Sequence, residues 1–281
     1  MPLLNDLFDI TLSDPADAYP IHLDLADYIP EKSDGFALPP IARVEEASPS
    51  QHGASDHGFR LLPRRLTFEV TLRAQTPQEF YERRAALLAV LRPSIYASPA
   101  RLSITLPEGT TWNLAVFCRN LTFSMRPGLI QSALFTLTAP NPVFVQQTPA
   151  VAAYFYQADI NTSHIITYPG TWLAAPFPFS IRGPITHPVV TNLSAQTKID
   201  LDYTVPDNQT VVIDLRPSYK TVKLGSTSLL GSLSSDSDLD TFCLLPAPEA
   251  PSGANLIQVT GSGVGVNTCV TLAYTPTRLG I

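Results

Sequence analysis

The segment Arg65-Leu66-Thr67-Phe68-Glu69-Val70-Thr71-Leu72-Arg73-Ala74 alternates strictly between polar and apolar side chains. Its even positions hold leucine, phenylalanine and valine up to Leu72, and its odd positions hold arginine, threonine and glutamate. Successive side chains of a strand point to opposite faces of a sheet, so this pattern predicts a half-buried antiparallel strand over 65–73.

A helix is predicted directly after this strand, over about 77–92. Thr76 supplies an N-cap side chain, Pro77 stands at the first helical position and Glu79 completes a capping box. Apolar residues then recur at helical spacing, and Pro93 marks the end of the segment. No other segment of the sequence carries comparable helix signals.

The rest of the sequence predicts strands separated by turns. In the first half they cover 102–106, 111–125 and 129–138, with turns at Pro107-Glu108-Gly109 and Arg126-Pro127-Gly128. The polar segment Ser48–Gly58 is expected to be a mobile hairpin tip, and Gln146–Pro178 a linker with the first strands of a second domain. Seven later strands are expected: Phe179–Arg182, Val189–Asn192, Lys198–Val205, Thr210–Asp214, Thr221–Leu224, Asn255–Thr260 and Thr268–Tyr274.

Length and composition favour two mostly β domains. A chain of 281 residues exceeds what one hydrophobic core usually organises. With 44% hydrophobic and only 15% charged residues, the chain can bury large cores but has few charged residues for exposed helix faces. Prolines at 140 and 142 close the first series of strands. We therefore predict a first domain over 1–145 and a β-sandwich over 146–281.

Charge is distributed unevenly along the chain. Residues 1–59 carry eleven acidic and two basic residues, a net charge of −9, whereas residues 60–126 carry ten basic and four acidic residues, a net charge of +6. The basic residues alternate with apolar ones in strands, which argues against a nucleic-acid patch. No apolar run reaches the length of a membrane span, so we expect a soluble protein made in the cytoplasm, without membrane insertion.

Several motifs are candidate sites of chemistry. Asp236-Ser237-Asp238-Leu239-Asp240 begins like a calcium loop, but Thr241 and Ala247 replace the glycine and glutamate that an EF-hand requires. Gly261–Gly265 opens no helix that would hold a phosphate, and is expected to be a flexible hairpin loop. His52, His57 and Asp56 lie in a polar loop, where a surface role is favoured over metal binding. No G-x-S-x-G elbow occurs.

The three cysteines, Cys118, Cys243 and Cys269, lie in apolar strand-like runs without metal-ligand spacing. They are expected to be buried free thiols, with neither a disulfide nor a zinc site. We therefore expect no catalytic, cofactor-binding or metal-binding residues, and no enzyme.

The order of these elements resembles the distal tail protein (Dit) family of siphophages. In that family an R-x-h-x-h-x-h-x-h-x-A strand (h apolar) is followed by a helix, a β-meander and a P-x-F terminator, which are similar to 65–74, the helix and Pro142-Val143-Phe144. Ile181–Ile185 and Asn255–Gly261 are similar to later motifs of the family, the second to a G-x-N-x-I-x-V-x-G pattern. The resemblance covers most of the chain and is weakest in the first sixty residues.

The resemblance implies a tail-tube-like β-barrel with one flanking helix, followed by a galectin-like or carbohydrate-module-like β-sandwich. It also implies a structural virion protein that forms a hexameric ring at the phage tail tip. Such a ring connects the tail tube protein to the tail hub or tip protein, serves as a dock for receptor-binding or side-fibre proteins, and lets DNA pass without specific binding. The alternatives are a host-polysaccharide-binding module and another tube or baseplate protein of the same fold.

The uneven charge distribution could contribute to ring assembly. In a head-to-tail ring each subunit offers two different surfaces, and opposite charges on them would steer assembly. Candidate interface residues are Arg65, Arg73, Arg83 and Arg84, which would face the acidic N-terminal segment of a neighbour. The alternative is that these charges pair within one subunit.

Sugar binding would require exposed aromatic residues in the second domain. The candidates are Tyr154, Tyr156, Trp172, Tyr203 and Tyr219. Core packing is the favoured interpretation for most of them, because large aromatic side chains dominate sandwich cores.

Overall fold

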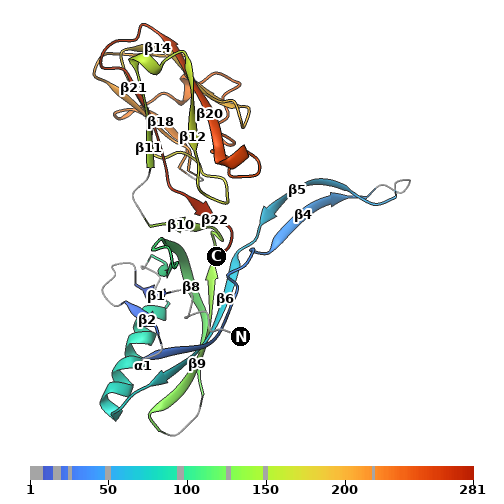
Figure 1. The fold of residues 1–281 in the computed structure, drawn as a ribbon, viewed down its shortest axis with the longest axis vertical. Helices are drawn as coiled ribbons and strands as arrows, with labels where there is room; N and C mark the ends of the chain where they lie inside the picture. The colour runs from blue at the N-terminus through green and yellow to red at the C-terminus, as the bar shows by residue number, and fades with distance from the viewer. Residues whose placement is uncertain are drawn as a thin grey trace. The chain divides into compact units, whose positions relative to one another are not determined.

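The computed structural model describes residues 9–14, 20–24, 27–47, 52–93, 98–124, 128–147, 151–216 and 219–281. The chain divides into two compact units, the first comprising Met1–Gln147 with Leu279–Ile281 and the second Thr148–Arg278 (Figure 1). Met125, Arg126 and Pro127, at which a strand end and a turn were predicted, lie outside the described residues.

Unit 1 is built on one curved sheet that nearly closes into a barrel. Its strands are β1 (Asp9–Ser13), β2 (Ile21–Leu23), β3 (Tyr28–Asp34), β6 (Arg64–Arg73), β7 (Ala100–Thr105), β8 (Thr111–Phe123), β9 (Ile130–Ala139) and β10 (Phe144–Gln146). They pair antiparallel in the order β2-β1-β7-β8-β9-β6-β3, and β10 adds to β8. The expected mostly β barrel is confirmed.

The alternating segment forms β6, as predicted. Leu66, Phe68, Val70 and Leu72 are fully buried, whereas the odd-numbered side chains from 65 to 73 face outward. The strand begins one residue earlier than predicted, at Arg64, which lies on the buried face.

The predicted helix is confirmed as α1 (Pro77–Leu91). Thr76 Oγ1 accepts a hydrogen bond from Glu79 N at 3.2 Å, and Glu79 Oε2 accepts one from Gln75 N at 2.7 Å. The hydrogen bond from Gln75 is the main cause that lowers the pKa of Glu79. Within the described part of the chain α1 is the one α-helix, and none of the described helices is long and apolar enough to span a membrane.

Unit 2 contains two antiparallel sheets whose inward side chains form one hydrophobic core. The first has the order β11-β21-β13-β17-β18-β19 and comprises β11 (Val151–Tyr156), β13 (Phe179–Arg182), β17 (Thr210–Asp214), β18 (Thr221–Leu224), β19 (Thr227–Ser228) and β21 (Cys269–Tyr274). The second has the order β12-β20-β14-β15 with β16 beside β14, and comprises β12 (Thr162–Thr167), β14 (Ile185–Asn192), β15 (Thr197–Asp200), β16 (Thr204–Val205) and β20 (Ala254–Ser262). Short 3₁₀ turns cover Gln157–Asp159, Leu230–Ser232 and Pro251–Gly253.

The structure differs from the predictions at four places. The segment Lys198–Val205, predicted as one strand, forms two strands, β15 and β16. Gly261–Gly265 is not a hairpin loop, because it links β20 and β21, which belong to different sheets. The expected hairpin tip Ser48–Gly58 is shorter than predicted, because strand β5 (Ser55–Leu61) begins within it and pairs antiparallel with β4 (Ile41–Glu46); residues 48–51 lie outside the described residues. Leu279–Ile281 belong to unit 1, where Ile281 N donates to Phe36 O at 3.1 Å.

Candidate assembly surface

A buried arginine organises the part of unit 1 from which an arm extends. Arg64 is 1% exposed, and its guanidinium donates to carbonyl oxygens of four separate residues. Nε donates to Pro142 O at 3.0 Å and Nη1 to Gly35 O at 2.6 Å, and further bonds reach Ala37 O and Leu279 O. Burial lowers the pKa of Arg64 to about 10, so the side chain keeps its charge at neutral pH. Hydrogen bonds from the charged guanidinium to these carbonyl groups tie the segments together.

This geometry corrects the alignment of the strand motif. Arg64 lies on the same face as Leu66 and Ala74, because side chains two residues apart share a face. The arginine of the R-x-h-x-h-x-h-x-h-x-A pattern is therefore Arg64 and not Arg65. Its guanidinium also lies 4.9 Å from the centroid of the Phe144 ring, so it contacts both ends of the P-x-F terminator.

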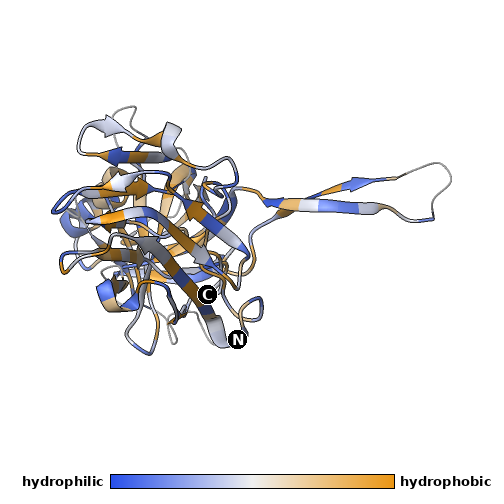
Figure 2. Ribbon diagram, turned by 90° about the horizontal axis from the view of Figure 1, so that it is seen from above, coloured by the Kyte–Doolittle hydropathy of each residue, from blue (hydrophilic) through white to orange (hydrophobic). Residues whose placement is uncertain are grey.

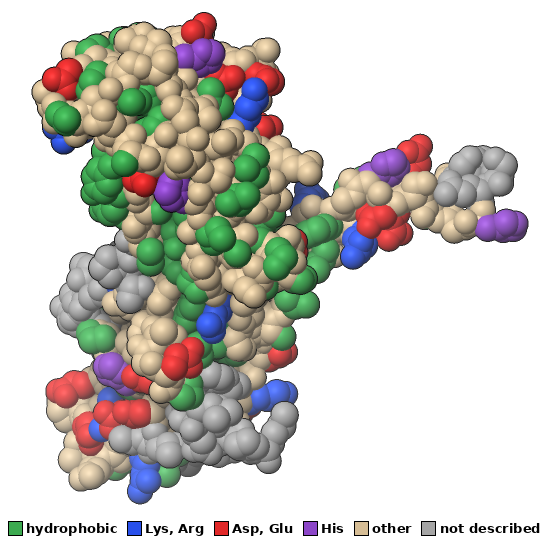
Figure 3. All heavy atoms as spheres, turned by 45° about the horizontal axis from the view of Figure 1, so that its top comes forward, with side chains coloured by type: hydrophobic (Ala, Val, Ile, Leu, Met, Phe, Trp, Pro, Cys, Tyr) green, Lys and Arg blue, Asp and Glu red, His purple; other side chains and the backbone are tan. Residues whose placement is uncertain are grey.

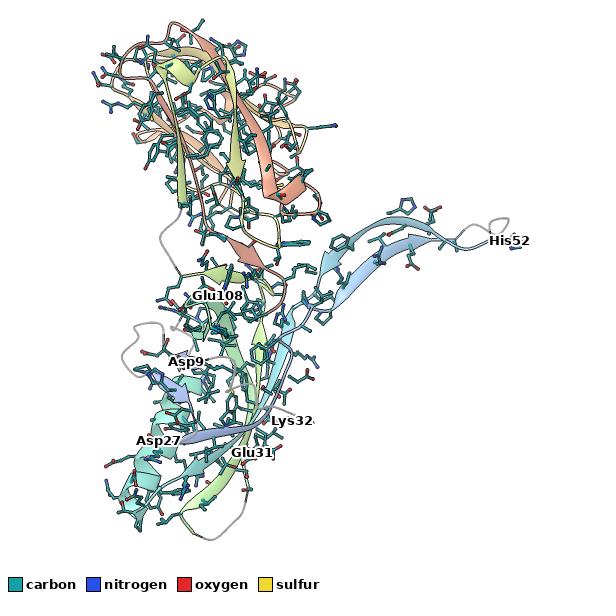
Figure 4. The ribbon with its side chains drawn as sticks, viewed as in Figure 1. Asp9, Asp27, Glu31, Lys32, His52 and Glu108 are labelled. Carbon is teal, nitrogen blue, oxygen red and sulfur yellow. The ribbon has the colours of Figure 1, made fainter. Side chains whose placement is uncertain are left out.

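Strands β4 and β5 form a two-stranded arm that extends away from the sheet of unit 1 (Figures 1 and 2). Its register pairs Ile41 with Leu61 at the root, and His52 lies at the far end (Figure 4). Apolar side chains are exposed along it: Ile41 is 44%, Val44 57% and Phe59 50% exposed. An isolated two-stranded ribbon is marginal in water, so the exposed apolar side chains of this arm mark a candidate contact surface.

Charged and histidine side chains lie along the outer part of the arm, and hydrophobic side chains gather at its root (Figure 3). Asp56 pairs with Arg43, and His57 Nε2 lies 3.3 Å from Glu46 Oε2. The Asp56 and His57 side chains thus have separate partners, which leaves no shared metal position among these groups.

A hollow of about 960 Å³ lies beside the root of the arm. Its wall combines apolar Leu38 with the cationic Arg65 and Arg119 and the hydroxyl groups of Thr136 and Thr138. A second groove, of about 570 Å³, lies between α1 and β8 and is lined by apolar groups that include Leu88 and Leu121. Leu88 is 44% exposed, so part of the apolar lining of this groove is accessible to solvent.

The four interface candidates separate into two pairs. Arg65 and Arg73 are exposed on the outer face of β6. Arg83 instead pairs within the chain, since its guanidinium lies 2.7 Å from Asp27 and contacts Glu79 and the Arg73 carbonyl. Asp27 is labelled beside α1 in Figure 4.

Arg84, the other helix candidate, lies over the Phe123 ring at 4.4 Å. Both helix arginines are thus occupied by contacts within their own subunit. Arg65 and Arg73 are the two of the four candidates whose side chains are exposed.

The aspartate run of unit 2 does not converge on a common point. Asp236 pairs with Lys198, Asp238 accepts from Lys198 N at 2.9 Å, and Asp240 pairs with Lys220. Lys198 is the main cause that lowers the pKa of Asp236 to about 2. The described residues contain no group of three or more His, Cys, Asp and Glu side chains that could hold a metal ion.

The cysteines and aromatic residues differ in part from expectation. The three cysteines are free thiols but only partly buried. Burial raises the pKa of Cys118 and of Cys243. Core packing is wrong for Tyr154, Tyr156 and Tyr219, which are 55%, 57% and 65% exposed. Trp172 and Tyr203 are partly buried.

No family model and no curated protein sequence matches the chain. Among solved structures, the crystal structure of the SPP1 Dit (gp 19.1) protein, described as a paradigm of the hub adsorption apparatus in phages infecting Gram-positive bacteria, matches with a TM-score of 0.65. The two chains are 13% identical, and the match covers 95% of this chain and 98% of that one. The chain has the Dit fold. A chain of the phage P2 baseplate in its activated conformation with Ca also matches, at a TM-score of 0.44 and 10% identity over 98% of this chain and 99% of that one.

Sequence reasoning missed two parts of this surface. The sequence pattern did not indicate that Arg64 is buried, although its even number places it in phase with Leu66. A hairpin tip was expected at Ser48–Gly58, but the two strands of the arm were not predicted, because both faces of β4 and β5 are exposed and an alternating pattern arises only when one face is buried.

Proposed function

We propose that this protein is a structural component of a phage tail, which assembles as a closed hexameric ring between the tail tube and the tail tip. The Dit fold of the whole chain supports this role. The observation that carries the proposal is the arm, on which the apolar side chains of Ile41 and Val44 are exposed.

The arm supplies one half of a head-to-tail contact. It projects from one side of unit 1 and needs a different surface of a neighbouring copy to cover its apolar side chains. A contact between two different surfaces closes into a ring when the rotation between neighbours fits. The hollow beside the arm root, which has a mixed apolar and cationic wall, and the apolar groove between α1 and β8 are surfaces of unit 1 that such a neighbour offers.

In this proposal the tail tube protein and the tail hub or tip protein bind opposite sides of the ring. Receptor-binding or side-fibre proteins dock on it, and DNA passes through its lumen without specific recognition. The protein resides in the virion at the tail tip and assembles in the host cytoplasm, and it needs no cofactor and performs no catalysis.

Deletion of the arm tests the proposal. Ile41 and Leu61 are cross-strand partners, so residues 42–60 can be replaced by a two-residue glycine turn without moving the root. Mass photometry of the full-length protein, alone and with its tube and hub partners, should show closed rings, and the deletion variant should remain a monomer.

An unchanged circular dichroism spectrum and thermal midpoint of the variant would show that the loss is not due to misfolding. A full-length protein that stays monomeric alone and with both partners would overturn the ring. If the deletion variant still forms rings, the arm is not required for ring closure.

A further inference from the structure

Two tyrosine rings stand exposed at one edge of the six-stranded sheet of unit 2. Tyr154 and Tyr156 lie on the edge strand β11, and their ring centroids are 6.3 Å apart with an interplanar angle of 16°. Phe155, between them, is 2% exposed and belongs to the core. The two tyrosines therefore share the outer face of the sheet, and core packing does not explain them.

The strand register aligns polar residues beside these rings. Tyr156 lies opposite Cys269, which lies opposite Arg182 on β13. Tyr154 lies opposite Thr271, which lies opposite Ser180. Paired strands are about 4.8 Å apart, so Arg182 stands about 10 Å across the face from Tyr156, beyond a strip of small side chains.

Two cations on this face have no carboxylate partner among the described residues. Arg182 donates to the neutral side-chain oxygen of Asn208 at 2.8 Å. Lys223 lies further along the row of Tyr154, and is exposed. Other basic side chains of unit 2 do have such partners, since Arg216 pairs with Asp214 and Lys220 with Asp240.

We propose that this outer face binds an acidic polysaccharide. The apolar faces of its sugar rings would stack on Tyr154 and Tyr156, and its carboxylates would bind Arg182 and Lys223. Guanidinium groups bind carboxylates through paired, charge-assisted hydrogen bonds, and tyrosine combines an apolar ring with a polar hydroxyl. The unpaired cations favour an acidic chain over a neutral one. This activity goes beyond the proposed ring and does not require it.

Affinity electrophoresis of the full-length protein tests this site. In native gels that contain polygalacturonate, the protein should be retarded, whereas neutral dextran should leave its mobility unchanged. The double variant Tyr154→Ala/Tyr156→Ala should weaken this binding at least tenfold. Arg182→Ala should weaken it as well, and leave the remaining binding less sensitive to salt.

Tyr219→Ala provides the matched control, because Tyr219 is exposed to a similar degree but does not lie on β11. It should bind as the original protein does. Absence of retardation by polygalacturonate, or equal retardation of the double variant, would overturn the proposal. If the double variant instead fails to bind a purified tail protein while no polysaccharide is bound, this face is a protein dock. Mass photometry of the same variants reports ring formation separately.

Discussion

The guanidinium of Arg64 lies 4.9 Å from the ring centroid of Phe144, and the same group donates to the carbonyl of Pro142, two residues before that ring. One buried side chain of β6 thus holds the segment that ends the strands of unit 1. It also holds the segment that leads into the arm, through Gly35 and Ala37, and the C-terminal tail, through Leu279.

Loss of the Arg64 side chain should destabilise unit 1 strongly. Arg64→Ala removes hydrogen bonds to four buried or partly buried carbonyls, and we expect the free energy of unfolding to fall by about 3 kcal/mol. Arg64→Lys should recover only part of this loss, because an ammonium group cannot reach all four acceptors. Urea unfolding followed by circular dichroism measures both. Arg65→Ala, one residue along and exposed, is the control and should change stability by less than about 0.5 kcal/mol.

Tyr28 should make the stability of unit 1 depend on alkaline pH. Its hydroxyl donates to Arg83 O at 2.8 Å, and burial is the main cause that raises the pKa of Tyr28 from 10.0 to about 12. The folded state thus keeps a proton that the unfolded state loses, so this contribution is complete below pH 10 and disappears as pH rises towards 12.

Urea titrations between neutral pH and about pH 11.5 should show this decline, and Tyr28→Phe should lessen it while costing about 1 kcal/mol at neutral pH. Tyr81→Phe, on the exposed side of α1, should behave as the original protein does. An identical decline in Tyr28→Phe would assign the pH dependence to other groups.

Asn255 should be essential for the loop that precedes β20. Its side chain bridges both backbone groups of Leu245, at 2.8 and 2.9 Å, and also donates to Gly253 O. Asn192, fully buried like Asn255, donates to it at 3.1 Å. Asn255→Ala should lower the free energy of unfolding of unit 2 by about 3 kcal/mol, because several buried groups lose their partners together.

Asn255→Asp keeps the acceptor and loses the donors, so it separates the two roles of this side chain. Thermal melts of both variants test the expectation, with Gln258→Ala on the same strand as control. A melting temperature of Asn255→Ala equal to that of the control would contradict the role of this network.

Charge reversal on β6 should slow ring assembly without affecting the fold. Arg65→Glu/Arg73→Glu replaces two exposed cations that an acidic neighbour would attract, so association should be slower and less dependent on salt. Light scattering across a salt series measures the rate. Arg83→Glu is expected to lower stability instead, since it breaks the contacts with Asp27 and Glu79. Equal assembly rates for the double variant and the original protein would exclude steering by these arginines.

Unit 2 should fold without unit 1. A fragment covering 148–278 contains both sheets and their common core, and we expect a β-type circular dichroism spectrum with one cooperative melt. An unfolded fragment would mean that the two cores depend on each other.

The sequence by itself determined the strand 65–73, the helix and most strands of the second half, because burial of one face imposes a period of two or 3.6 on the residues. The capping signals of Thr76 and Glu79 are equally local, and they defined the start of α1. The G-x-N pattern pointed to Asn255 without indicating what its side chain binds.

Only the tertiary structure decided which polar residues are partners, since these contacts join segments far apart in the sequence. Arg64 donates a hydrogen bond to the carbonyl of Leu279, 215 residues later in the sequence, and no local sequence pattern predicts a contact between such distant segments. The strands of the arm and the exposure of Tyr154 and Tyr156 could not be predicted from the sequence, for a related reason. Exposure depends on what packs against a strand, and the same aromatic residue types occur on outer faces and in cores.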